Sequence, residues 1–210
     1  MKIGILGSGD VAQSLGRGIA RHGHDVMLGT RDASKLAEWK AETKAKVGSF
    51  ADAARHGEVV ILALNGRGAS AALDMAGVAS FAGKLVLDAT NPLEHSDEGV
   101  SLFVGTTDSL GERIQRQLTD AKVVKCFNTV SHIQMVDPTF KEGTPPMLIA
   151  GNDGDAKKRA EAFLRELGWP GVIDTGDIRQ ARWLEALVPL WVAVALARGQ
   201  EWSHAFKSVV

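Results

Sequence analysis

Six residues near the start of the chain have the types and the spacing that a dinucleotide-phosphate site requires. They read Gly7-Ser8-Gly9-Asp10-Val11-Ala12, the pattern G-x-G-x-x-A, and they directly follow an apolar run. Gly7 would allow a tight turn, Gly9 would let the backbone approach a pyrophosphate, and Ala12 would let a helix pack closely on the strand. The free N–H groups of that helix would bind the pyrophosphate. We therefore expect the residues from Gly7 to Val11 to contact a bound dinucleotide.

The residues after the second predicted strand indicate which nicotinamide dinucleotide would bind. An acidic residue there would bind a ribose 2′-hydroxyl, whereas a basic residue would suit a 2′-phosphate. The chain reads Gly29-Thr30-Arg31, and Lys35 follows Arg31 by four residues, so the two cations can point the same way. Asp32 could turn inward and bind a hydroxyl instead. The balance favours NADP over NAD, with contacts from Thr30, Arg31 and Lys35.

Three further strand ends would complete the site, because ligands of such sheets bind at the carboxyl ends of the strands. These segments are Leu64-Asn65, Asn91-Pro92 and Asn128-Thr129. The extended Asn91-Pro92 segment would orient a nicotinamide carboxamide through its carbonyls and side-chain amide. An ordinary turn is the alternative reading at each position. His132, just beyond, would contact the substrate or lie on the surface.

A parallel sheet would bring these residues together, and the chain alternates strand and helix patterns as such a sheet requires. Near-continuous apolar runs predict six parallel strands, covered by helices on both faces, over Lys2–Leu6, Asp25–Leu28, Val59–Leu64, Lys84–Ala89, Lys122–Phe127 and Pro146–Ala150. Helices are expected over Val11–His22, Ala33–Lys46, Ala69–Met75, Ser109–Leu118 and Asp155–Leu167. A short strand over Val172–Asp174 precedes a last helix from Ile178 to about Arg198. The expected fold class is α/β, a Rossmann-type doubly wound parallel sheet with a short C-terminal helical extension.

The predicted organisation is an NAD(P)-binding Rossmann domain over residues 1–177 and a C-terminal helical segment over residues 178–210. The last helix is apolar nearly all round, so it must be buried. It would pack on its own sheet, or partly against a second copy of the chain in an isologous homodimer. Trp183 and Trp191 are expected to fill the core rather than to wall a planar ligand.

The composition of the 210-residue chain argues against several other classes. A formal net charge of −1 is not that of a general nucleic-acid or membrane-surface binder. The single cysteine, Cys126, lies in a predicted buried strand and allows no intrachain disulfide or cysteine metal cluster. The longest apolar run, Ala186 to Ala197, is too short to span a bilayer, and a strand pattern from Lys2 leaves no room for a signal peptide. We expect a cytoplasmic protein without a metal site.

With these features the whole chain resembles the coenzyme F420-dependent NADP oxidoreductases, small enzymes that pass hydride between NADP and a deazaflavin. The resemblance rests on Gly7-Ser8-Gly9-Asp10, Gly23-His24, Gly29-Thr30-Arg31 with Lys35, the strand end from Lys122 to Thr129 and, most restrictively, Ala181-Arg182-Trp183-Leu184-Glu185-Ala186-Leu187. It implies one Rossmann domain with a few terminal helices, usually as a dimer. It also implies NADPH and coenzyme F420 as ligands, with contacts at Ser8 to Val11, Thr30, Arg31, Lys35 and the loops after later strands.

One departure from that family bears on the acceptor. The family carries a histidine near the acceptor where this sequence has Asn128. The run Cys126-Phe127-Asn128-Thr129 instead resembles the reductase domains of the metalloreductases, which reduce a flavin. The resemblance therefore implies NADPH as the donor and a deazaflavin or a flavin as the acceptor.

Two other functions fit the same dinucleotide motif. An imine or hydroxyacid reductase related to pyrroline-carboxylate reductase would share the N-terminal half, but such enzymes generally build the substrate site with a large helical domain. The residues from 178 to 210 cannot supply that domain. A non-catalytic NADP sensor would bind NADPH without turnover. Hydride transfer between stacked rings needs little side-chain acid–base chemistry, and we assign no catalytic residue from the sequence.

Overall fold

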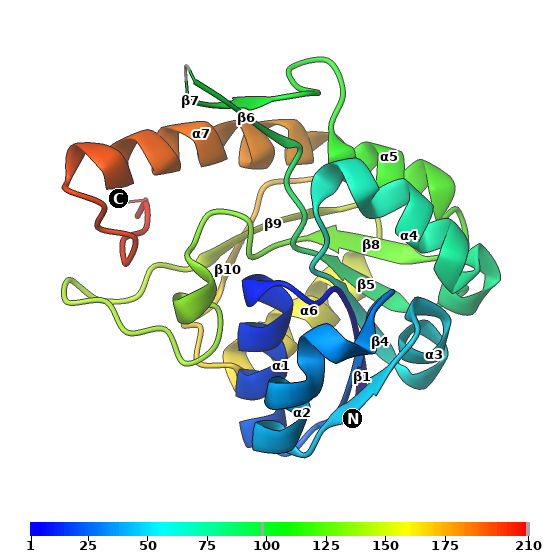
Figure 1. The fold of residues 1–210 in the computed structure, drawn as a ribbon. Coiled ribbons are helices and arrows are strands. Elements are labelled where there is room, and N and C mark those ends of the chain that lie inside the picture. Colours follow the sequence, from blue (N-terminus) through cyan, green and yellow to red (C-terminus); the bar gives the residue numbers. More distant parts are fainter. Residues whose placement is uncertain (98, 209–210) are drawn as a thin grey trace.

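The fold is built around one eight-stranded sheet with the strand order β10-β9-β8-β5-β4-β1-β2-β3 (Figure 1). The computed structural model describes residues 1–97 and 99–208. The strands in these residues are β1 (Lys2–Leu6), β2 (Asp25–Gly29), β3 (Lys46–Gly48), β4 (Val59–Leu62), β5 (Leu85–Asp88), β6 (Leu93–Ser96), β7 (Gly99–Leu102), β8 (Lys122–Lys125), β9 (Met147–Gly151) and β10 (Val172–Asp174). β1 pairs with β2 on one side and with β4 on the other. The strand order therefore reverses beside β1, at the position where open α/β sheets bind their ligands.

Helices cover both faces of this sheet. They are α1 (Asp10–Arg21), α2 (Ala37–Thr43), α3 (Phe50–His56), α4 (Ala69–Ala76), α5 (Leu110–Gln117), α6 (Gly154–Glu166) and α7 (Ala181–Ala197), with 3₁₀ turns η1 (Ala33–Leu36), η2 (Gly66–Gly68), η3 (Val78–Phe81), η4 (His132–Gln134) and η5 (Ile178–Gln180). Alternate strand residues point to opposite faces, so Ile61 packs with α1, α2 and α6 while Leu62 packs with α3, α4 and α5. The predicted doubly wound architecture is thus confirmed.

The prediction of uniformly parallel strands is wrong at one edge of the sheet. β9 pairs antiparallel with β8, and β10 pairs parallel with β9, so both run against the other strands. A parallel neighbour would need a crossover connection of a dozen or more residues, usually a helix. The segment between β8 and β9 carries no helical pattern in the sequence, and the structure has only the short turn η4 there. The missing helix was the available signal for the reversal.

The single helix predicted over Ala33–Lys46 is also wrong. The segment forms η1 and then α2, and the chain leaves α2 where Lys44 takes a left-handed φ of 56°. The edge strand β3 and helix α3 follow. α3 begins with a capping box in which Ser49 and Asp52 satisfy each other's backbone N–H groups. That spacing was a helix-start signal, whereas the largely exposed hairpin of β6 and β7 has no apolar pattern to predict it.

The last helix, α7, contacts α5, β7 and β9, and Figure 1 shows it passing between the sheet and the β6–β7 hairpin. Trp191 is buried as expected, but Trp183 is 55% exposed, which corrects its predicted place in the core. Leu190 and Leu196 are exposed as well, so α7 presents an apolar face away from the sheet. Among the described residues, Ile178–Ala197 is the one helical stretch long and apolar enough to cross a membrane by length and composition, and 33% of its most apolar part is buried inside the protein.

A buried ion cluster fastens α7 to the sheet. Lys125 at the end of β8 and Asp88 at the end of β5 are fully buried, and Glu185 of α7 is 1% exposed. Lys125 Nζ lies 3.0 Å from both Asp88 Oδ2 and Glu185 Oε1, and it also donates to the carbonyl oxygen of Thr90. Burial acts to lower the pKa of Lys125, but the two carboxylates more than offset it, so the pKa is raised and the ammonium stays charged. The ammonium group of Lys125 therefore links the ends of β5 and β8 to α7.

Removing that charge is expected to be costly. Lys125→Met would leave two buried carboxylates without their cation, and it should lower the free energy of unfolding by about 3–5 kcal/mol. Urea unfolding at neutral pH measures the change. Lys122→Met on the same strand is the matched control, because Lys122 and its partner Asp153 are both substantially exposed, and the loss should stay below about 1 kcal/mol. Equal effects of the two substitutions would contradict the structural role of the cluster.

Candidate active site

The loop after β1 has the shape that a phosphate site needs. Gly7 has a φ of 143°, and a Cβ there would lie 2.1 Å from the carbonyl oxygen of Ala63, so the turn itself requires glycine. A Cβ at Gly9 would meet no heavy atom within 4 Å. The fold therefore does not require glycine at position 9, and its missing side chain leaves open space at the start of α1. Within the described residues no side chain caps this helix, which leaves its first N–H groups available to a ligand.

One pocket extends from this loop to the end of β2. This glycine-loop pocket has a volume of about 540 Å³ and is lined by Gly7, Ser8, Gly9, Thr30, Arg31, Asp32, Lys35, Phe50, Ala63, Leu64 and Asn65. Asp32 also lines this pocket, and its Oδ1 accepts hydrogen bonds from the backbone N–H and the hydroxyl of Ser34. These bonds hold the pKa of Asp32 below its usual range. Arg31 and Lys35 are exposed and form no ion pair among the described residues, so they can meet an anion.

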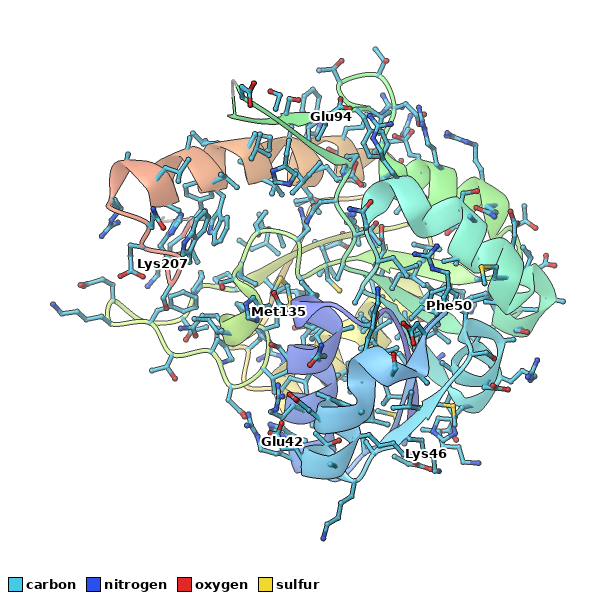
Figure 2. All side chains as sticks on the ribbon, viewed as in Figure 1. Glu42, Lys46, Phe50, Glu94, Met135 and Lys207 are labelled. Carbon is cyan, nitrogen blue, oxygen red and sulfur yellow. The ribbon has the colours of Figure 1, made fainter. Side chains whose placement is uncertain are left out.

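A second pocket lies on the other side of the loop, between the start of α1, the ends of β5 and β8, and α7. This apolar pocket has a volume of about 520 Å³ and is lined by Val11, Ala89, Asn91, Leu93, Phe127, Asn128, Val130, Ser131, His132, Ile133, Met135, Val188, Trp191, Val192 and Trp202. In Figure 2, Met135 marks the apolar pocket near α1, and Phe50 marks the glycine-loop pocket. One elongated ligand that crosses the loop would occupy both.

Two buried amide oxygens in the apolar pocket lack partners. Oδ1 of Asn91 and Oδ1 of Asn128 are buried without a hydrogen bond, although both residues line the pocket. The amide nitrogen of Asn128 is held, because it donates to the carbonyl oxygen of Leu184 on α7 at 2.6 Å. Buried polar atoms are normally paired, so these two oxygens are suited to accept hydrogen bonds from a bound carboxamide.

The ends of β5 and β8 are held so that these asparagines reach the pocket. Asp88 Oδ1 accepts hydrogen bonds from the backbone N–H and the hydroxyl of Thr90, which fixes the residue before Asn91. On the neighbouring strand, Phe127 takes a left-handed φ of 62° while its side chain is fully buried. A bulky residue in that conformation costs about 1–3 kcal/mol and persists only where its surroundings enforce it. The surrounding packing thus sets the direction in which Asn128 leaves the strand.

The ionisable groups near the apolar pocket are few. His132 is the one titratable side chain among its lining residues, and its Nδ1 lies 2.8 Å from Ser14 Oγ on α1. Cys126, one residue before Phe127, is fully buried, and burial raises the pKa of its thiol. It therefore packs as a small apolar residue and offers no thiolate nucleophile, as the sequence predicted. No group of metal-ligating side chains occurs among the described residues.

The structure brings most of the predicted contact residues together. Eight line the glycine-loop pocket, and Val11, Asn91 and Asn128 line the apolar pocket. Asp10, Pro92 and Thr129 line neither of these two pockets. As contacts to a bound cofactor all fourteen stay predictions. Sequence reasoning missed the walls made by Phe50 and Trp202, which come from segments without a recognisable motif.

The residues present fit an NADP molecule. The open space at Gly9 suits a pyrophosphate, the unpaired cations Arg31 and Lys35 suit a 2′-phosphate, and the two orphan amide oxygens suit the nicotinamide carboxamide. Bound there, NADPH would supply a hydride. The pocket beside the asparagines could then hold a hydride acceptor. Fold and site together define a dinucleotide-dependent oxidoreductase.

Comparison with known proteins specifies the family. A model of the coenzyme F420-dependent NADP oxidoreductases matches residues 2–92. The F420-dependent NADP reductase of Methanothermobacter marburgensis is 31% identical over 207 residues, which cover 91% of each protein. The crystal structure of an Arthrobacter sp. FB24 protein assigned as an F420-dependent NADP-reductase has a TM-score of 0.95 and 39% identity over all of both chains. The chain belongs to the coenzyme F420-dependent NADP oxidoreductase family and is an NADPH-dependent oxidoreductase.

More distant similarities cover only part of longer proteins. Rat metalloreductase STEAP3 is 29% identical over 213 residues, which cover 94% of this chain but only 39% of that protein. The pyrroline-5-carboxylate reductase of Coxiella burnetii has a TM-score of 0.65 at 18% identity and is covered to 68% by this chain, which itself aligns over 94%. At that identity the likeness shows the shared fold alone.

Substitutions of the two loop glycines are expected to affect different properties, ligand binding at Gly9 and stability at Gly7. Gly9→Val should cost less than about 1 kcal/mol of folding free energy, since its side chain enters open space, yet it should abolish NADPH and NADH binding. Gly7→Val should lower stability by at least about 2 kcal/mol, because it clashes with the Ala63 carbonyl at a positive φ. Thermal unfolding and fluorescence titration of NADPH measure both effects. Retained affinity in folded Gly9→Val would contradict the phosphate site.

Arg31 should set the preference between the two nicotinamide dinucleotides. Arg31→Glu removes a partner of the 2′-phosphate and adds repulsion, so the Kd for NADPH should rise about 10-fold to 100-fold while that for NADH changes less than about threefold. Arg55→Glu is a control, because Arg55 is an exposed cation of α3 that does not line the glycine-loop pocket. An equal loss of affinity for both dinucleotides would contradict the assignment of NADP.

Proposed function

We propose that this protein transfers a hydride between NADPH, bound across the glycine loop, and a planar deazaflavin or flavin ring held in the apolar pocket. Coenzyme F420 is the acceptor that we favour, because related proteins carry its name. The observation that carries the proposal is the position of the apolar pocket, which adjoins the two asparagines suited to the nicotinamide.

The lining of the apolar pocket supports a ring as its occupant. Apolar side chains from α1, the loop after β8, α7 and the C-terminal tail surround it, including the indoles of Trp191 and Trp202. These two rings lie 5.7 Å apart, and Trp191 also stacks on His204 at 4.8 Å. Aromatic walls of this kind bind planar ligands by offset stacking and exclude water from the site of hydride transfer. The pocket volume of about 520 Å³ lies within the range of small-molecule sites.

Asn128 is compatible with a deazaflavin or with a flavin as the acceptor. Its free amide oxygen is an acceptor of hydrogen bonds and does not ionise, so it can serve the nicotinamide carboxamide without taking part in proton transfer. The histidine that the family resemblance implies at this position is therefore not needed for the hydride step itself. Turnover with each acceptor in turn distinguishes a deazaflavin from a flavin.

An imine or hydroxyacid reductase related to pyrroline-carboxylate reductase is disfavoured by the same lining. Pyrroline carboxylates and hydroxyacids carry a carboxylate, which requires a cation or several N–H donors when it is buried. None of the residues that line the apolar pocket is a lysine or an arginine, and His132 is the one side chain among them that can carry a positive charge. About a third of the pyrroline-5-carboxylate reductase of Coxiella burnetii also has no counterpart in this chain.

The proposal extends to a cytoplasmic homodimer. Trp183 and Leu190, seven residues apart, lie on the same exposed face of α7, and Leu196 is exposed nearer the end of the helix; each is more than half exposed. Apolar side chains grouped on one helix face are commonly covered by a second copy, and a two-fold axis would place the two faces together. In such a dimer α7 would bridge the apolar pocket and the partner.

The function is tested by anaerobic turnover of NADPH with coenzyme F420, with FMN and with FAD in parallel. We expect rapid reduction of F420 and slower or no reduction of the flavins, followed through the absorbance of each acceptor. Gly9→Val is the control, since a folded protein that cannot bind the dinucleotide must be inactive with every acceptor. Reaction with a flavin alone would move the assignment to a flavin reductase. No turnover with any of the three, despite tight NADPH binding, would overturn the proposal and favour a sensor.

A further inference from the structure

His132 is placed to do chemistry that hydride transfer alone does not supply. Reduction of a deazaflavin or flavin ring by NADPH to its neutral dihydro form takes up one hydride and one proton. The hydride leaves NADPH, but the proton must come from the protein or from water. His132 is the one titratable side chain among the residues that line the apolar pocket.

The two ring nitrogens of His132 have different surroundings. Nδ1 lies 2.8 Å from Ser14 Oγ, so this edge of the imidazole is held by a hydrogen bond to α1. No hydrogen bond to Nε2 occurs among the described residues, and this nitrogen remains available to a molecule in the pocket. His132 is only partly buried, so it can regain a proton from solvent between turnovers. When one nitrogen is held by a neighbour, the imidazole keeps its orientation and the other nitrogen can move a proton.

We propose that His132 is the acid of the reaction, holding at Nε2 the proton that the acceptor takes up when it is reduced by NADPH. The proposal rests on the function proposed above. His132 starts as the imidazolium, with Nδ1–H donating to Ser14 Oγ and Nε2–H directed to the acceptor. The N–H bond at Nε2 breaks as the acceptor gains the proton, and a neutral imidazole with Nδ1–H remains. In the opposite direction the neutral imidazole accepts the same proton at Nε2.

The charges around His132 come from three elements. The titratable groups of α1 and the residue after it, of the loop after η4 and of the C-terminal tail are Asp10, Arg17, Arg21, His22, Asp137, Lys141, Glu142, Arg198, Glu201, His204 and Lys207. Arg17 pairs with Glu42, and both Arg21 and His22 pair with Asp137. His204 binds the Glu201 carbonyl through Nδ1. Among the described residues none of these groups forms an ion pair with His132, so its protonation governs the acid step.

The pH profile of the reduction rate tests this role. In single-turnover mixing of the NADPH complex with the acceptor, the rate should fall with rising pH, because only the imidazolium donates. His132→Asn should be slower by about 100-fold at low pH and should lose this dependence. Ser14→Ala should be slower but keep it. His95→Asn, an exposed histidine of β6 outside both pockets, is the matched control and should match the unaltered protein.

Two further measurements distinguish proton donation from a structural effect. Added imidazole should restore the rate of His132→Ala in proportion to the imidazolium concentration. In the protein without NADPH, the oxidised acceptor should change the NMR chemical shift of the His132 ring protons and leave those of His95 unchanged. If His132→Asn reacts within threefold of the rate of the unaltered protein, or if imidazole gives no rescue, His132 is not the proton donor. The proposed function would stand in that case. An unaltered protein that reduces none of the acceptors would overturn the proposed function, and this proposal with it.

Discussion

The active site depends on one buried ammonium group. Lys125 at the end of β8 pairs with Asp88 at the end of β5 and with Glu185 of α7, and all three side chains are essentially inaccessible to solvent. A buried cation is tolerated only when charged partners and hydrogen bonds surround it. Asp88 and Lys125 also bind the backbone of Thr90, next to Asn91, and Glu185 adjoins Leu184, whose carbonyl holds Asn128. Both asparagines of the pocket are therefore positioned through this cluster.

The residues from Ala181 to Glu185 fix α7 on α5 through a dense set of contacts. Glu185 accepts the first N–H groups of α5 from Leu110 and Gly111, each at 2.9 Å. A Cβ at Gly111 would approach Ala181 to 2.9 Å, so the two helices require small residues where they cross. The Arg182 guanidinium donates two hydrogen bonds, of 2.7 and 2.8 Å, to the Glu112 carboxylate. Every one of these residues docks α7 on α5, and α7 in turn supplies a wall of the apolar pocket. The contacts that dock α7 on α5 therefore also help to build the acceptor side of the proposed site.

The features that sequence reasoning could predict are those encoded by neighbouring residues. The glycine loop, the first two strands and α1 follow from local spacing, and the structure places Gly7, Gly9 and Arg31 in one pocket. The ion cluster could not be predicted, because Lys125 at a strand end looks like a solvated charge until residues 88 and 185 are brought beside it. The antiparallel direction of β9 is hard to predict for a different reason. The six apolar runs are alike and carry no sign of direction, so the only local signal is the connection between β8 and β9, which lacks the helix of a parallel crossover.

Under the proposed function, the glycine-loop pocket would provide affinity for the dinucleotide and the apolar pocket would position the reacting rings. The glycine-loop pocket has the unpaired cations and the open helix end, so phosphate binding can supply most of the dinucleotide affinity. The apolar pocket has two fixed amides and a single titratable side chain, so it contributes orientation, exclusion of water and at most one proton. A site with so few polar groups cannot select its acceptor by charge at the reacting ring. Under the proposed function, selection would come from the shape of the pocket, to which Trp191 and Trp202 of the C-terminal segment contribute. Eleven of the fifteen lining residues belong to the Rossmann half, so both parts of the chain would shape the acceptor side of the site.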